Sequence, residues 1–204
     1  MNCTLYSVFI NNVQEKIVNV TITEEAGHDE ALYGMSLSFY DGKTHKDAWW
    51  DEQYTKALKR SKKLAHMDGG HNKFLEHIEV WMEVRAPLSW WKHADTYRTS
   101  SKQSESTMHT LKKRLPLTKK DFSFNVHDNV IEAFNLVAEG TKDISVLADN
   151  LPDGFLQTRI WKMSYKTLRN VVHQREGHRL GHWADFIQQV REQIEHPEYI
   201  WKEE

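Results

Sequence analysis

The stretch GGHNKFLEHIEVWMEVRAP, at residues 69–87, contains the clearest strand pattern in the chain. Four apolar side chains occupy alternate positions from Ile78 to Val84, which is typical of a strand with one face in a core. Gly69 and Gly70 interrupt the chain before this pattern, and Pro87 ends it because proline cannot donate a hydrogen bond within a sheet. The stretch therefore predicts a β-strand between a turn and a proline.

The chain before and after this strand divides into a β-rich first part and a polar middle. Alternating apolar residues predict strands at residues 4–10, 17–23 and 32–40. A stripe of apolar residues at helical spacing predicts a helix at residues 47–66. Residues 100–120 are rich in Ser, Thr and Lys, and this composition predicts a long loop.

The C-terminal third carries the apolar spacing of amphipathic helices. Asp128 is placed to cap the first of these helices, which stops at Gly140. The predicted helices cover residues 128–140, 143–148, 154–174 and 180–194. No internal repeat and no linker composition is evident, so the sequence predicts one α+β domain over residues 1–204.

Composition limits the class of protein. The chain has 204 residues, of which 39% are apolar and 27% charged, as in ordinary globular proteins. No apolar run approaches the roughly 20 residues that span a bilayer, and the N-terminus lacks a secretory pattern. Cys3 is the single cysteine, so no intrachain disulfide can form and a cytoplasmic location is expected. The net charge of −2 argues against a nucleic-acid partner, and no membrane partner is expected.

Twelve histidines raise the question of a metal site. His178 and His182 are four residues apart, a spacing that would put both side chains on one face of a helix. No spacing completes a zinc motif, so surface or hydrogen-bonded histidines are expected and no metal site is predicted. The chain also lacks a glycine-rich phosphate loop and a G-x-S-x-G hydrolase elbow.

Three sequence elements follow one another in a distinctive order. GGHNKFLEH (residues 69–77) leads into the strand, APLSWWKHADTYRTSSKQSES (residues 86–106) follows, and LPDGF precedes a segment that ends SYKTLRNVVHQR (residues 164–175). This order resembles the flavin-dependent thymidylate synthases, which methylate dUMP with reduced FAD and methylenetetrahydrofolate. The family segments G-H-x-[ST]-P-F-E-H, R-H-R-x-x-S, L-P and N-x-x-x-x-R correspond to segments within residues 65–190. Lys73-Phe74-Leu75 depart from the first of them, and Thr96 and Tyr97 replace the first two residues of the second. The spacing needs no gap from Pro87 through the second motif, or from Pro152 to Arg175.

The resemblance implies a fold, an assembly and a cofactor site. The fold would be an antiparallel sheet with long helices, and the assembly a homotetramer that uses FAD, with NADPH and methylenetetrahydrofolate as co-substrates. His71 matches the family histidine that faces the flavin, and Asn170 matches the helix asparagine near it. Arg98 and Ser101 keep the last arginine and the serine of the R-H-R-x-x-S motif.

The same resemblance implies a site for a pyrimidine nucleotide such as dUMP. Ser106 matches the serine that lies against the nucleotide, and Arg175 matches the arginine that contacts and polarises the pyrimidine, which makes Arg175 the implied catalytic residue. Gln103 and Ser104 stand where the family has an Asn-Glu pair, at the substrate. The implied reaction is reductive methylation, or a related one-carbon transfer, at C5 of the pyrimidine.

Several family arginines are missing. Thr96, Met108 and Ala148 stand at the positions of arginines that lie near the nucleotide phosphate and the flavin. A protein binds phosphate chiefly through charge-assisted hydrogen bonds, so weaker nucleotide binding is expected unless other cations take over. The candidate substitutes are Lys92, Lys102 and Lys112.

Three functional readings remain open at this stage. The retained Arg175, Asn170 and Arg98 favour an enzyme, while the missing arginines favour a nucleotide-binding protein of the same fold without methyl transfer. A nucleic-acid binder that uses the basic residues 112–120 is the third reading, and salt-dependent DNA binding would identify it.

Overall fold

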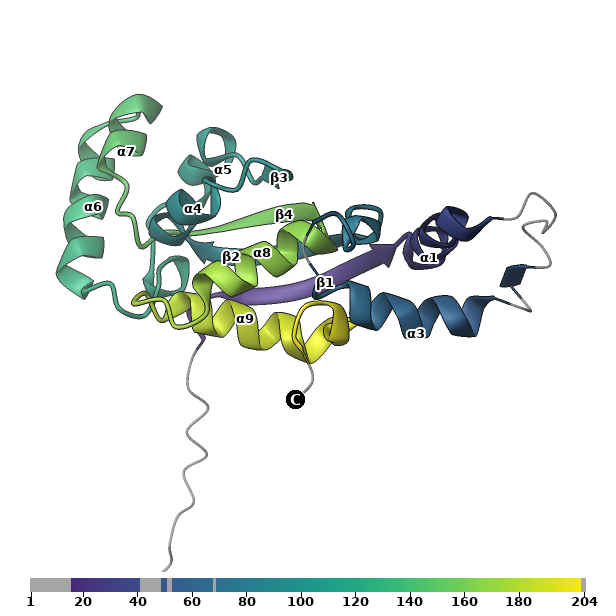
Figure 1. Cartoon of the computed structure of the whole chain (residues 1–204). Helices are drawn as coiled ribbons and strands as arrows, with labels where there is room; N and C mark the ends of the chain where they lie inside the picture. Colours follow the sequence, from purple (N-terminus) through teal and green to yellow (C-terminus); the bar gives the residue numbers. More distant parts are fainter. Residues whose placement is uncertain (1–15, 41–48, 51–52, 68, 203–204) are drawn as a thin grey trace, which may run out of the picture.

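The computed structural model describes residues 16–40, 49–50, 53–67 and 69–202 (Figure 1). Its centre is a four-stranded sheet in the order β1-β2-β4-β3, in which every neighbouring pair is antiparallel. The strands are β1 (Asn19–Ala26), β2 (Glu79–Pro87), β3 (Ser100–Ser104) and β4 (Leu156–Ser164). Helices α8 and α9 lie against the sheet, and α6 and α7 stand apart at one end of the molecule (Figure 1). The predicted α+β class with an antiparallel sheet is therefore confirmed.

The helices are mostly short and follow the strands along the chain. Before β2 come α1 (His28–Ser36), η1 (Leu37–Phe39), α3 (Tyr54–Leu64) and η2 (Lys73–Glu76). Between β2 and β4 come α4 (Leu88–Ala94), α5 (Thr107–Arg114), η3 (Lys119–Asp121), α6 (Asp128–Gly140) and α7 (Ile144–Asn150). After β4 come α8 (Tyr165–Arg175), α9 (His182–Gln193) and η4 (Pro197–Tyr199). None of the helices in the described ranges is both long enough and apolar enough to cross a membrane.

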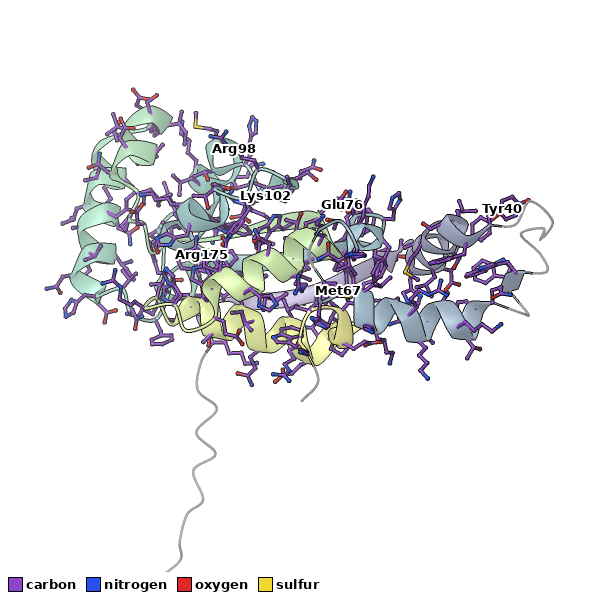
Figure 2. The ribbon with its side chains drawn as sticks, viewed as in Figure 1. Tyr40, Met67, Glu76, Arg98, Lys102 and Arg175 are labelled. Carbon is purple, nitrogen blue, oxygen red and sulfur yellow. The ribbon has the colours of Figure 1, made fainter. Side chains whose placement is uncertain are left out.

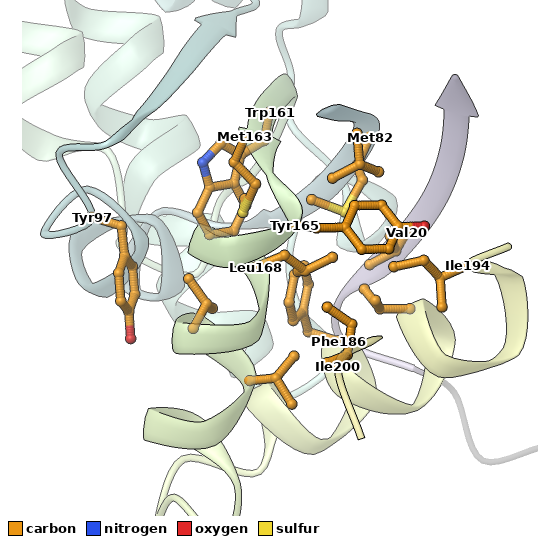
Figure 3. Close-up of a cluster of buried hydrophobic side chains, with 14 of the residues drawn as sticks. Val20, Met82, Tyr97, Trp161, Met163, Tyr165, Leu168, Phe186, Ile194 and Ile200 are labelled. Atoms are coloured by element: carbon orange, nitrogen blue, oxygen red, sulfur yellow. The ribbon is translucent and has the colours of Figure 1, made fainter. Parts of the chain in front are cut away.

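One face of the sheet carries the main core. Val80, Met82 and Val84 of β2 are fully buried, and Met82 pairs with Trp161 of β4. Figure 3 shows part of this cluster, in which side chains of the strands meet those of α8 and α9, such as Leu168. Full burial of one such apolar side chain contributes on the order of 1.5–3 kcal/mol, so this layer fixes α8 and α9 on the sheet.

The predicted strand at residues 78–84 and most C-terminal helices are confirmed. Helix α6 has the predicted bounds, although its N-cap is His127, whose Nδ1 accepts a hydrogen bond from the amide of Asn129, and not Asp128. Asp143 caps α7, accepting a hydrogen bond from the amide of Ser145 at 2.9 Å. The predicted strand at residues 17–23 overlaps β1, and the helix predicted at residues 180–194 contains α9. The strand predicted at residues 4–10, Cys3, and part of the helix predicted at residues 47–66 lie outside the described residues.

The long helix predicted at residues 154–174 is wrong. Its first half is strand β4, which pairs with β2 on one side and β3 on the other. Trp161 and Met163 alternate toward the core, a period-2 signal that the helical reading of the whole segment hid. Ser164 marks the change, because its hydroxyl accepts a hydrogen bond from the amide of Thr167 and caps α8.

The strand predicted at residues 32–40 is also wrong, since this segment belongs to α1 and η1. Alternate apolar residues misled the prediction: Leu37 is 49% exposed and Phe39 70% exposed, so neither belongs to a core face. The buried residues are Ala31 and Leu32 in the first turns of the helix.

Two further predictions of local structure fail in the polar segments. Residues 100–120 are not a loop but contain β3 and α5, and their polar composition reflects an edge strand and an exposed helix anchored by the buried Leu111. His178 precedes α9, which begins at His182, so the two histidines do not share a helix face.

Gly27 sets the entry into α1. Its φ of 87° lies in the left-handed region, and a Cβ there would come within 2.3 Å of the backbone oxygen of His77. We expect Gly27→Ala to destabilise the protein by at least about 2 kcal/mol, because it combines backbone strain with a contact that only backbone movement can relieve. Urea unfolding measures this loss.

Gly34 in the same helix provides the matched control. It has negative φ, and no atom lies within 4 Å of a Cβ added there. Gly34→Ala should leave stability unchanged or raise it by roughly 0.5–1 kcal/mol. Equal effects of the two substitutions would contradict the role given to Gly27.

Candidate functional site

A polar groove of about 1130 Å³ opens beside the first turns of α8. Its walls come from residues 69–79, from β3, and from the end of β4 together with α8. The residues on which its chemistry depends are Gly70, Glu76, Ser101, Lys166, Arg169 and Asn170. The groove thus brings together two of the predicted cofactor residues, Ser101 and Asn170.

The charges in this groove are partly paired. Lys166 forms an ion pair with Glu76 at 2.5 Å, and Lys162 forms one with Glu79 at 2.7 Å. The hydrogen bond from Lys166 lowers the pKa of Glu76 below its usual value, so this carboxylate stays ionised at neutral pH. Arg169 lies in the same groove, makes no ion pair with a described residue, and has a buried Nε atom without a hydrogen-bond partner. The lining cations therefore exceed the lining carboxylates.

The start of α8 adds hydroxyl groups and a helix N-terminus to the groove. Ser164 caps the helix, and the hydroxyls of Thr99 and Thr167 lie 3.1 Å apart. The N-terminus of a helix carries partial positive charge on its free amides. This end of the groove is suited to an anionic group such as a phosphate.

A second pocket, of about 620 Å³, lies on the other side of the segment that carries His71. Gly70 lines both pockets. The second pocket is lined by four basic residues and no acidic one, and the Arg60 guanidinium lies 4.3 Å from the centre of the Phe39 ring. His71, expected at the flavin, therefore borders this pocket and not the first groove.

Arg175 is the last residue of α8 and does not line the groove, although His173 in the same turn does. Figure 2 shows Glu76 and Arg175 near opposite ends of the helix. The Arg175 Nε donates a hydrogen bond to the Tyr97 hydroxyl at 2.8 Å, and its guanidinium carbon lies 4.8 Å from the Trp183 ring centre. Tyr97, which stands where the family has a motif histidine, thus orients the arginine, a role that sequence reasoning missed. The terminal nitrogens of Arg175 make no hydrogen bond to a described residue, so they are available to a ligand.

The remaining predicted site residues lie along the edge strand and just beyond it. Arg98 projects from the surface before β3 (Figure 2). Gln103 and Ser104 are exposed on β3 and do not line the groove, and Ser106 is the exposed N-cap of α5. One chain therefore does not bring the predicted cofactor and substrate residues into a single pocket.

The lysines expected to replace the missing arginines are mostly engaged. Lys92 forms an ion pair with Asp153 at 2.5 Å. Lys102 lies 3.8 Å from Asp95, whose carboxylate also accepts two hydrogen bonds from Arg159 at 3.0 and 3.2 Å. Burial, and to a lesser degree Arg159, lowers the pKa of Lys102. Lys112 is exposed and makes no ion pair with a described residue, so of the three it alone is unengaged. Across the described ranges, no group of three or more His, Cys, Asp or Glu side chains is arranged to hold a metal ion.

Comparison with known proteins identifies the fold. No protein-family model matches the chain, and no curated protein matches it in sequence. The structure is similar to that of Thymidylate Synthase X (ThyX) from Helicobacter pylori, which was determined with FAD and dUMP. The TM-score is 0.72 and the sequence identity 14%, and the match covers 90% of this chain and 97% of that chain. A second structure of the flavin-dependent thymidylate synthase ThyX from the same organism, also complexed with FAD and dUMP, gives a TM-score of 0.71 and 15% identity over 90% and 98%. The predicted fold is thereby confirmed.

Proposed function

We propose that this chain, which has the fold of a flavin-dependent thymidylate synthase, binds FAD and methylates C5 of a pyrimidine nucleotide such as dUMP. The observation that carries the proposal is the cationic groove at the start of α8, in a fold whose solved examples hold FAD and dUMP. Methylenetetrahydrofolate would supply the carbon and NADPH the two electrons. Fold alone does not determine function, so the side chains of this chain must carry the chemistry.

The groove fits a dinucleotide cofactor. Its volume of about 1130 Å³ slightly exceeds the range typical of ligand sites, roughly 300–1000 Å³, and so has room for a ligand as large as a dinucleotide. Lys166, Arg169 and the positive end of the α8 dipole suit a diphosphate, while Asn170 and Ser101 offer neutral hydrogen-bonding groups. The unpartnered Nε of Arg169 is a donor that such an acceptor would satisfy. When bound, FAD would supply hydride transfer.

Arg175 is the proposed catalytic residue. Tyr97 and Trp183 fix the plane of its guanidinium and leave its terminal nitrogens free. A fixed cation beside the pyrimidine would stabilise the negative charge that develops on the ring as C5 attacks the carbon donor. Ser106, with Gln103 and Ser104, would hold the nucleotide on the neighbouring edge of the sheet. The C5 proton would leave for solvent once the new carbon–carbon bond has formed, the bond from the transferred carbon to tetrahydrofolate would break, and a hydride would complete the methyl group.

The separation of the site residues favours an assembly. Asn170, at the middle of α8, and Ser101 line the groove, whereas Arg175 at the end of the helix does not, and Gln103 and Ser104 face outward on the edge strand. Phe39, 70% exposed, and Leu136, 67% exposed, would also be covered in an oligomer. We therefore propose a homotetramer in which several copies complete each site.

A second candidate function is nucleotide binding without methyl transfer. The residues that replace family arginines support it: Thr96, Met108 and Ala148 are all exposed, and none can neutralise a phosphate. The two functions differ in one result, which is the release of hydrogen from C5 of the bound nucleotide.

For the cofactor, we expect the purified protein to take up FAD, with weaker binding after Lys166→Gln. Removing one charge-assisted hydrogen bond to the diphosphate should lower affinity about tenfold or more. Quenching of flavin fluorescence during titration measures this change. Lys142→Gln, at an exposed lysine between α6 and α7, should bind FAD as the wild type does. Absence of any FAD binding at millimolar concentration would refute the cofactor assignment.

For the reaction, we expect tritium release from C5-labelled dUMP in the presence of FAD, NADPH and methylenetetrahydrofolate. Arg175→Lys keeps the charge but loses the planar fork, so turnover should fall about a hundredfold or more. If the wild type releases no tritium from dUMP, dCMP or UMP, the binding function replaces the enzymatic one. Equal activity of the variant would show that Arg175 is misplaced in the site.

For the assembly, light scattering at micromolar concentration should give the mass of four chains. Each chain has a mass of 24.1 kDa, so a tetramer and a monomer are easily separated. A stable monomer that still binds FAD and dUMP would contradict the shared-site arrangement.

A further inference from the structure

Five basic side chains gather where α8 ends and α9 begins. Arg175 is the last residue of α8, Arg179 lies in the connection, and His182 opens α9. The His93 ring, in the last turn of α4, meets the His178 ring edge to face with 5.7 Å between centroids. None of the five forms an ion pair with a carboxylate of the described residues.

The cluster holds several hydrogen-bond donors without a partner. The His178 Nδ1 accepts the amide of Leu180 at 3.0 Å, so in the neutral ring the proton lies on Nε2, which faces no acceptor among the described residues. The Tyr97 hydroxyl holds Arg175 through Nε alone, which leaves its terminal nitrogens as a free fork. The Nδ1 atom of His182 is buried and has no partner.

The charges that act on these histidines come from three helices and a loop. Three positively charged or ionisable groups act on His178: Arg175 from α8, His93 from α4 and Arg179 from the connection. On His182 the charges are those of His93 and, with opposite sign, Asp185 of α9. The carboxylate of Asp185 is itself engaged, accepting the amide of Ile17 at 3.0 Å. Positive charge therefore dominates, with one engaged carboxylate beside it.

We propose that this cluster binds a phosphate monoester, with the Arg175 fork, His178 and His93 as donors. Resting on the proposed function, we further assign that phosphate to the pyrimidine nucleotide, so that histidines take the place of the arginines that the chain lacks at Thr96, Met108 and Ala148. A dianion is the ligand class that best compensates five clustered basic groups, and the planar Arg fork matches two of its oxygens.

This site would depend on pH, unlike one built from arginine alone. Burial lowers the pKa of His178, and the charges of Arg175, His93 and Arg179 lower it further. Burial and, to a lesser degree, His93 lower the pKa of His182, while Asp185 raises it. Without a ligand both rings are thus neutral at about pH 7. A bound dianion favours the charged rings, so binding takes up protons. Because the pKa of both free rings lies below the usual histidine value of about 6.5, affinity should rise as pH falls toward and below that value and be weaker above it.

The test uses radiolabelled sulfate in equilibrium dialysis, because sulfate keeps two negative charges between about pH 5 and pH 8, whereas phosphate titrates in that range. We expect one site per chain, tighter at about pH 6 than at about pH 8. The double variant His93→Gln/His178→Gln should lose about tenfold in affinity at the lower pH, together with the part of the pH dependence that His178 contributes.

Two further variants guard against misfolding. Arg179 is exposed, so Arg179→Gln should leave thermal unfolding unchanged and still weaken sulfate binding, by up to about fivefold. His127→Asn keeps the capping acceptor of α6 and should bind sulfate as the wild type does. Sulfate binding that is unaffected by both the double variant and Arg179→Gln would overturn the site.

A second arm compares dUMP with deoxyuridine to identify the source of the phosphate. If the cluster holds the nucleotide phosphate, the double variant loses affinity for dUMP but not for deoxyuridine, and sulfate competes with dUMP. Tight dUMP binding that the double variant leaves unchanged would overturn the nucleotide assignment while the proposed function stands. Sulfate binding at the cluster without any dUMP binding would instead overturn the proposed function and leave a site for free phosphate.

Discussion

The junction at Ser164, where the central strand β4 becomes helix α8, is the constraint on which the rest of the structure depends. The strand is held on both sides by β2 and β3, and its Trp161 and Met163 are buried against the helices. Because the helix starts where the strand stops, the direction of α8 is fixed by the sheet. Its first turns then face the cationic groove, and its last turn carries Arg175 to Tyr97 and Trp183. Both candidate binding regions are thus placed by one capped turn.

Sequence reasoning could find this fold only in part, and the reasons are physical. β2 was predictable because its apolar residues alternate without interruption, and α6 because turn and cap signals bracket it. β4 was missed because its apolar residues merge with those of α8 into a run that suits a long helix, and only Ser164 separates them. The alternation at residues 32–40 suggested a strand, but Leu37 and Phe39 are exposed, and no pattern in one sequence reveals which side of an element is covered.

For the candidate site, the sequence could name residues but could not show which side chains they contact. Ser101 and Asn170 line one groove, and their role as cofactor residues stays a prediction. The ion pair between Lys166 and Glu76 joins residues 90 positions apart. The hydrogen bond between Arg175 and Tyr97 joins residues 78 positions apart. Contacts of this range follow from the sheet order and not from local spacing. The engagement of Lys102 by Asp95 has the same origin, and it removes a cation that composition alone would have counted as free.

The positive charge that the family motifs would place in three arginines is redistributed in this chain. One part lies in the groove, where Lys166 and Arg169 stand beside the start of α8, and another lies at the opposite end of the same helix. A guanidinium is charged at every physiological pH, whereas a clustered imidazole is charged only when an anion or an acidic medium makes it so. A site in which imidazoles replace guanidiniums can still bind an anion, but its affinity is lower and depends on pH. In the site that we propose, Arg175 would belong to the anion site and also face the pyrimidine, so the chain could bind a nucleotide although Thr96, Met108 and Ala148 are not arginines. Within that proposed site, the absence of the three arginines and the presence of Arg175 would be compatible.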